Sequence, residues 1–130
     1  MITRNVNKSL YKNYLKKSEE FLKSCNEAFD DENYNSCVAN SVHSGISASD
    51  ALTVFFLGIR HAGEKHEDVI DLLRELKLKD INVKIKQLKD LLQLKNKAEY
   101  EEILMDKNKA ENAKKHAERF LSYAKSVLKE

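Results

Sequence analysis

The near absence of helix-breaking residues most constrains how this chain can fold. Proline does not occur, and glycine occurs only at Gly45, Gly58 and Gly63. Because proline interrupts helices and glycine weakens them, a 130-residue chain with so few of either favours long helices. Charged residues make up 34% of the chain, against a usual ~25%, as expected if long helices expose polar faces. We therefore predict an all-α fold in a single domain spanning residues 1–130.

Apolar residues recur every three or four positions and divide the chain into five predicted helices. Gly58 is expected to end the second helix, and Asp80 is expected to cap the fourth. Lysines along the fourth helix are expected to form a solvated face. The result is an up-and-down helical bundle of four long helices plus one short helix. The predicted ranges are about 8–29, 34–57, 67–76, 81–100 and 107–129.

The second predicted helix differs from the others in composition. Between Ser36 and Phe56 its only charged residue is Asp50, and serine, alanine and glycine occupy several of its faces. Small side chains allow neighbouring helices to approach closely from more than one side. We expect a central helix, surrounded by the others or packed against a partner subunit.

A polar stripe runs along this helix through Asn40, His43, Ser47 and Asp50. The steps of three, four and three residues place all four on one face. Buried polar groups need hydrogen-bond partners. Three interpretations remain open: a core network in which His43 bridges to Asp50 or to the backbone, a direct role in catalysis, and a polar seam that faces a second subunit.

Arg60, His61 and His66 lie in the segment that follows this helix, which we expect to be a loop. Arginine binds phosphate oxygens in a forked geometry, and histidine transfers protons near neutral pH. One arginine and one or two histidines suffice for RNA cleavage without a metal. A histidine deprotonates the 2′-hydroxyl or protonates the departing 5′-oxygen, while the arginine stabilises the transition state. A two-fold dimer would bring two such sets into one cleft.

Other chemistries are less well supported by the sequence. His61 and His66 with Glu64 or Glu67 could bind a divalent ion, but their spacing does not match a known zinc motif. The chain lacks the glycine-rich loops that bind nucleotide phosphates and the GxSxG motif of serine hydrolases. We therefore expect neither a metal nor a cofactor.

Charge, cysteines and hydropathy restrict the cellular setting. A net charge of +2 does not indicate nonspecific coating of nucleic acid. Cys25 and Cys37 form no CxxC pair and are expected to be buried thiols in a reducing compartment. The longest apolar run, residues 54–57, is too short to span a membrane, and no signal peptide is evident. We expect a cytoplasmic protein that does not enter a membrane.

Several segments together resemble the HEPN superfamily of helical-bundle proteins. Its motif, an arginine followed after four to six residues by a histidine, is matched by Arg60 and His66 at the end of the second long helix. The segment 43–52 resembles the pattern H-A-x-I-A-A-x-D-A-L of a bacterial subgroup. Further matches occur at 32–38, 63–69 and 97–100, so the resemblance extends from about Tyr14 to Leu128.

The resemblance implies a dimeric helical bundle that acts as a ribonuclease toxin or as an RNA-binding module. Many members pair with a nucleotidyltransferase-type antitoxin. Arg60 and His66 would be the catalytic pair, and His61 the assisting polar residue. The main prediction is thus a homodimeric, metal-independent endoribonuclease, a candidate toxin. The alternatives are a non-catalytic module that binds nucleotide, RNA or a partner protein, and a purely structural role for Arg60 and His66 through pairing with Asp50 or Glu67.

Overall fold

The structure is a computed structural model that describes residues 1–63 and 65–130. The described chain is 74% helical and has only a small two-stranded sheet, which confirms the all-α prediction. The helices begin and end within a few residues of the predicted positions. Their bounds are α1 (Tyr11–Asp30), α2 (Tyr34–Leu57), α3 (Asp68–Arg74), α4 (Ile81–Tyr100) and α5 (Lys107–Leu128). None of these helices is both long and apolar enough to cross a membrane.

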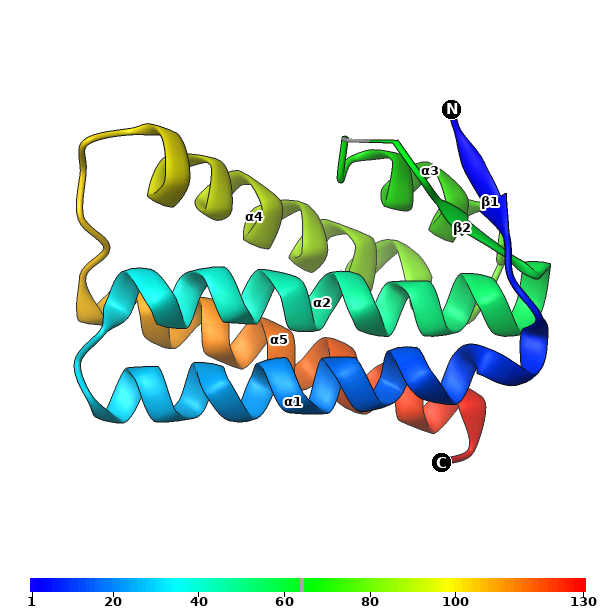
Figure 1. The fold of residues 1–130 in the computed structure, drawn as a ribbon, viewed down its shortest axis with the longest axis horizontal. Helices are drawn as coiled ribbons and strands as arrows, with labels where there is room; N and C mark the ends of the chain where they lie inside the picture. Colours follow the sequence, from blue (N-terminus) through cyan, green and yellow to red (C-terminus); the bar gives the residue numbers. More distant parts are fainter. Residues whose placement is uncertain (64) are drawn as a thin grey trace.

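The four long helices run alternately in opposite directions, and α2 lies in the middle (Figure 1). It contacts α1, α3, α4 and α5, and most of its residues are buried. This confirms the prediction of a central helix and identifies the other helices of the same chain as its neighbours. Both chain termini lie at the end of the bundle where α2 ends (Figure 1).

Small residues explain why α2 can be surrounded. Ser18 of α1 donates a hydrogen bond to the carbonyl oxygen of Ser44 at 2.8 Å, and Ser44 donates one to the carbonyl of Ser18 at 2.9 Å. Side-chain hydroxyls thus reach the backbone of the facing helix, which requires a close approach. On the α4 side, a Cβ at Gly45 would lie 3.1 Å from the Leu88 side chain. The composition of α2 therefore sets the width of the bundle on two of its sides.

Two short strands were not predicted. Strand β1 (Thr3–Asn5) pairs antiparallel with β2 (Ile59–His61), and Arg4 lies opposite Arg60. The prediction that Arg60 and His61 belong to a loop is therefore wrong. A three-residue strand is too short to produce a recognisable alternation of apolar and polar residues. The 3-10 helix η1 (Lys8–Leu10) then connects β1 to α1.

The predicted capping residues differ in their outcome. Asp80 occupies the position before α4, but its side chain makes no capping hydrogen bond and its φ is 63°, so the prediction of a side-chain cap is wrong. Asp106, which was not predicted as a cap, accepts a hydrogen bond from the backbone N–H of Lys109 at 2.8 Å at the start of α5. Gly58 ends α2 as predicted, with a left-handed φ of 69°.

The two cysteines meet between α1 and α2. Cys25 and Cys37 are fully buried free thiols whose sulfur atoms lie 3.3 Å apart. The hydrogen bond with Cys37, followed by burial, raises the pKa of Cys25. Their burial agrees with the prediction, and they belong to the packing of the core.

We expect the substitution Gly58→Ala to lower the free energy of unfolding by about 1 kcal/mol, because a Cβ is unfavourable at a left-handed φ. Gly58 also positions the strand that follows α2. A loss of stability of this size should lower the melting temperature by roughly 3–6 °C. Differential scanning calorimetry measures this change. The substitution Lys77→Gly is a suitable control, because Lys77 also has a positive φ, of 50°, and should gain stability. A melting temperature that is unchanged in Gly58→Ala would contradict this account of the helix end.

Candidate functional site

A cleft of about 600 Å³ opens between α1, α2 and the β1–β2 ribbon. The polar stripe of α2 and the histidines and arginine that follow this helix face the same space, although they are separated by up to 26 positions in the sequence. The structure thus brings all the predicted site residues together. They are Asn40, His43, Ser47, Asp50, Arg60, His61 and His66.

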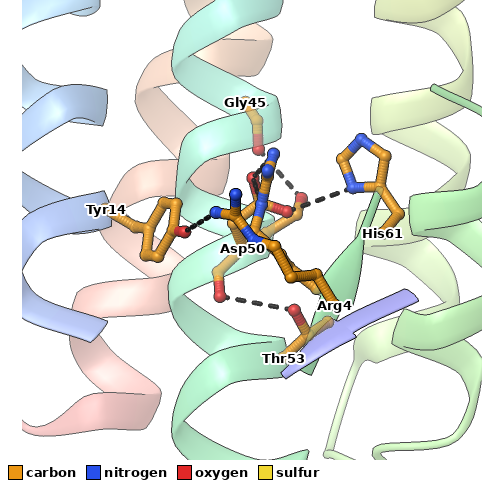
Figure 2. Close-up of polar contacts among 8 residues, drawn as sticks. Arg4, Tyr14, Gly45, Asp50, Thr53 and His61 are labelled. Atoms are coloured by element: carbon orange, nitrogen blue, oxygen red, sulfur yellow. Dashed lines mark hydrogen bonds and ion pairs between the residues drawn. The ribbon is translucent and has the colours of Figure 1, made fainter. Parts of the chain in front are cut away.

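Asp50 is the most deeply placed charged group of the cleft, with only 2% of its surface exposed. Figure 2 shows its carboxylate between Tyr14 on one side and His61 on the other. The Nε and Nη2 atoms of Arg60 both donate to its Oδ2, at 3.1 and 2.9 Å. These two bonds fix the plane of the guanidinium. The Nη1 group has no hydrogen-bond partner within the described residues, so it is available to a ligand.

His61 lies beside the same carboxylate. It is 3% exposed, and its Nδ1 is 3.3 Å from Oδ1 of Asp50. The approach is close enough for an electrostatic attraction, but its geometry is not that of a hydrogen bond. Within residues 1–63 and 65–130, both of these buried atoms therefore lack a hydrogen-bond partner. Buried polar atoms of this kind at a cleft wall are expected to be satisfied by water or by a ligand.

His66 and His43 are more accessible than His61, and both favour the neutral form. Burial, followed by the charge of Lys95, lowers the pKa of His66. The same two causes, in the same order, lower the pKa of His43. The His66 ring centroid lies 6.1 Å from that of His61, and His43 packs against Phe21 at 5.2 Å. A neutral imidazole at neutral pH is able to accept a proton.

Lys95 is an exception to the predicted solvated face of α4. It is only 7% exposed, and its Nζ lies 3.5 Å from Oε2 of Glu99. The sequence did not single it out because it belongs to a run of lysines at similar spacing. Its charge, close enough to act on His43 and His66, helps to keep both imidazoles neutral.

The structure also adds residues that the sequence did not mark as functional. Tyr14, Lys17 and Phe21 of α1 were not among the predicted site residues, but all three line the cleft. The guanidinium of Arg60 lies 5.5 Å from the centre of the Tyr14 ring, and the Nζ of Lys17 lies 5.4 Å from it. The sequence did contain a signal for these residues. Spacings of three and four residues put a lysine between two aromatic residues on one face of the helix.

One interpretation of the polar stripe is wrong in its detail. The carboxylate of Asp50 is hydrogen-bonded by Arg60 rather than by His43, so the proposed bridge between His43 and Asp50 is not formed. The Nδ2 of Asn40 donates to the carbonyl oxygen of Ser36 at 2.9 Å. The stripe therefore lines the cleft along most of its length. At its C-terminal end, Asp50 forms a buried ion pair with Arg60.

Metal binding was considered from the sequence for the two histidines with Glu64 or Glu67. In the part of the chain that the structure describes, no group of three or more His, Cys, Asp or Glu side chains is placed to hold a metal ion. Glu64 itself lies outside the described residues.

The lowered pKa values predict how stability depends on pH. Since His43 and His66 bind protons less readily in the folded state, the unfolded state holds more protons, and stability rises with pH. This contribution is complete above the ordinary histidine pKa of about 6.5 and is lost as the pH falls through the lowered folded values. We expect the melting temperature to fall between pH 7.5 and pH 5.

Melting curves of the wild type and of a His43→Gln, His66→Gln double variant measure this effect. The variant should show a weaker pH dependence, with a remainder from His116, whose pKa is lowered chiefly by burial. Equal pH dependence in the two proteins would contradict the assignment.

Comparison with known protein families identifies a match that covers most of these elements. The model of the HEPN domain matches residues 11–127, from the first residue of α1 to the last turn of α5. Comparison with curated proteins finds no sequence that matches this chain. The matched region contains the α1 and α2 walls of the cleft and the arginine–histidine motif, and leaves out residues 1–10, which include β1, and residues 128–130. Because the match extends over nearly the whole chain, this protein belongs to the HEPN domain family.

Proposed function

We propose that this protein is a metal-independent endoribonuclease whose active site is the cleft between α1, α2 and the β1–β2 ribbon. The observation that supports this most is the placement of Arg60 and His66 on one cleft, with the guanidinium oriented by Asp50. A fixed arginine and a neutral imidazole on one cleft supply the group that stabilises the phosphoryl oxygens and the general base for attack by the 2′-hydroxyl.

In the proposed reaction His66 accepts the proton of the 2′-hydroxyl. The 2′-oxygen attacks the phosphorus, and the bond to the 5′-oxygen of the next nucleotide breaks. The products are a 2′,3′-cyclic phosphate and a 5′-hydroxyl. Arg60 stabilises the negative charge that accumulates on the phosphoryl oxygens, using the donors that Asp50 does not occupy. His61 assists by keeping the Asp50 carboxylate in place, because its ring lies against Oδ1, the oxygen that Arg60 does not contact.

We further propose that the active form is a homodimer. The departing 5′-oxygen needs a proton, and one imidazole cannot accept and donate in the same step. A second copy across a two-fold axis supplies another arginine and another imidazole, which donates the proton in those molecules where it is protonated. Size-exclusion chromatography with light scattering tests this directly, and a strict monomer at assay concentrations would contradict it. The family resemblance suggests a toxin role and a nucleotidyltransferase-type antitoxin as the partner.

The nuclease proposal is tested by incubating the purified protein with cellular RNA in the presence of EDTA. We expect the wild type to produce fragments that end in a 2′,3′-cyclic phosphate. Arg60→Ala and His66→Ala should be inactive under the same conditions. Equal cleavage by all three proteins, or no cleavage by the wild type, would rule the proposal out.

The second candidate is a non-catalytic HEPN module that binds nucleotide, RNA or a partner protein. It is favoured by the ion pair itself, because Arg60 already has a carboxylate partner and has a structural use independent of any substrate. Binding of RNA or of a captured partner that is indifferent to His66→Ala, in a protein that does not cleave, would support this candidate. A wholly structural role predicts instead that Arg60→Ala and His66→Ala lower the melting temperature and change no binding.

A further inference from the structure

The charge of the Arg60 guanidinium is largely compensated before any substrate arrives. Asp50 lies 2.9 Å from it, and the pair has no net charge. The neutral form favoured by His66 adds none. A nucleic-acid phosphate in this cleft therefore needs cations besides Arg60 to balance its charge. Among the described residues of the cleft, Arg4 and Lys17 have positively charged side chains that form no ion pair with a carboxylate.

Arg4 is brought to the cleft by the unpredicted strand β1. It is directly opposite Arg60 in the antiparallel ladder, so the two side chains emerge on the same face of the ribbon. Its Nη2 donates a long hydrogen bond of 3.4 Å to the hydroxyl of Tyr14, and Figure 2 shows the two side chains directed toward each other. Arg4 is otherwise exposed and retains donors for a ligand.

The α1 wall continues from these arginines as a strip of cationic and aromatic groups. Lys17 follows Tyr14 by one turn, and Phe21 follows Lys17 by another, all facing the cleft. Tyr14 and Phe21 are seven residues apart, which corresponds to about 10 Å along the helix axis. Phe21 is partly exposed and already stacks at a tilt of 33° on His43.

We propose that Arg4, Lys17 and Phe21 form a subsite for the nucleotide next to the scissile phosphate of single-stranded RNA. Arg4 and Lys17 bind the phosphate of that nucleotide, and Phe21 with His43 forms the platform on which its base stacks. This subsite rests on the proposed nuclease function and identifies its substrate class. Single-stranded RNA fits because its bases are free to leave the stack and lie on an aromatic ring, whereas those of a duplex are not.

The phosphate contacts are tested with a fluorescent 2′-O-methyl RNA oligonucleotide, which the proposed reaction cannot cleave. We expect Arg4→Ala and Lys17→Ala each to raise its Kd about fivefold to tenfold, and to reduce the salt dependence of binding by about one counterion. Matched controls are Lys16→Ala, the neighbouring exposed lysine of α1, and Arg74→Ala on α3. Fluorescence anisotropy at several salt concentrations measures both quantities.

The base contact is tested by removing either partner. An oligonucleotide with one abasic position should bind the wild type about tenfold more weakly when that position occupies the subsite. Phe21→Leu, which keeps an apolar side chain against His43, should weaken binding of the intact oligonucleotide by a similar factor. The abasic change should then have no further effect in Phe21→Leu. Additive losses would show that the ring and the base do not interact.

These outcomes distinguish failure of the subsite from failure of the nuclease proposal. If the wild type cleaves RNA but Arg4→Ala, Lys17→Ala and Phe21→Leu bind like the controls, only the subsite is overturned. If binding depends on these three residues but no cleavage occurs, the contacts to single-stranded RNA stand, while their place next to a scissile phosphate falls with the nuclease proposal. No measurable binding of the oligonucleotide by the wild type would overturn the subsite.

Discussion

Replacing His66 with alanine is expected to lower the rate of RNA cleavage by about 10²–10⁴-fold, the usual contribution of a positioned acid–base group. The ring is partly buried, and its Nδ1 has no hydrogen-bond partner within the described residues, so its removal breaks no hydrogen bond seen there. The fold should therefore persist. The variant should lose activity because it lacks the imidazole, and it should keep its stability.

The matched control for this substitution is His116→Ala on α5. Burial is the main cause of a lowered pKa in His116 as well, but this histidine lies outside the cleft. Single-turnover rates should be unchanged in this control. In the wild type the rate should rise with pH as the accepting His66 loses its proton, and fall again as the donating imidazole loses its own. Burial and Lys95 lower the pKa of His66 and so shift the rising limb to lower pH. Equal loss of activity in both variants would assign the effect to folding instead of chemistry.

The second large effect is expected from Asp50→Ala, which should lower the free energy of unfolding by about 2–4 kcal/mol and also abolish cleavage. Removing one partner of a buried ion pair leaves the other charge uncompensated. Arg60 is 24% exposed, so part of its charge would be hydrated, and the effect should fall below that of a fully buried pair. Loss of the carboxylate also frees the guanidinium and the His61 ring to take other orientations.

Urea unfolding of Asp50→Ala, Arg60→Ala and the double variant measures this coupling. The double variant should be less destabilised than the sum of the two single changes, because no unpaired charge remains. Asp71→Ala serves as the control. Asp71 pairs with Arg74 on the surface, where both side chains are more than half exposed. Its removal should therefore change stability by no more than about 0.5 kcal/mol. Additive single effects would mean that the ion pair does not hold the site together.

Arg60→Lys separates the two uses of the arginine. A lysine keeps the positive charge next to Asp50 and should preserve most of the stability. It lacks the planar fork that can bind a carboxylate and a phosphate at the same time. The variant is therefore useful beside Arg60→Ala, in which structural and catalytic losses are combined.

The fold was predictable because its main determinants are local. The spacing of apolar residues marked each helix, and the small residues of α2 indicated a helix with neighbours on several sides. The hydrogen bonds that Ser18 and Ser44 exchange show that α1 approaches α2 closely at these small residues. Strand β1 was missed because its three residues pair with a segment more than fifty positions away, and no short-range pattern records such a pairing.

The candidate site was predictable to the extent that it lies on one helix and the segment after it. Helical spacing placed Asn40, His43, Ser47 and Asp50 on a common face, and chain continuity placed Arg60 and His66 near its end. The contributions of Arg4, Lys17 and Lys95 could not be derived in this way. Each comes from another element, and each resembles an ordinary surface cation until the packing of α1 and α4 against α2 and the pairing of β1 with β2 are known.

The most direct test of the central claim is cleavage of an RNA that contains one mapped cut site, in EDTA and under single-turnover conditions. A second substrate carries 2′-deoxyribose only at the nucleotide whose 2′-hydroxyl would attack. We predict that the all-ribose substrate is cut by the wild type and not by His66→Ala, and that the deoxy substrate is not cut at that position. Cleavage of the deoxy substrate at the same bond and rate, or equal cutting by His66→Ala, would contradict the account.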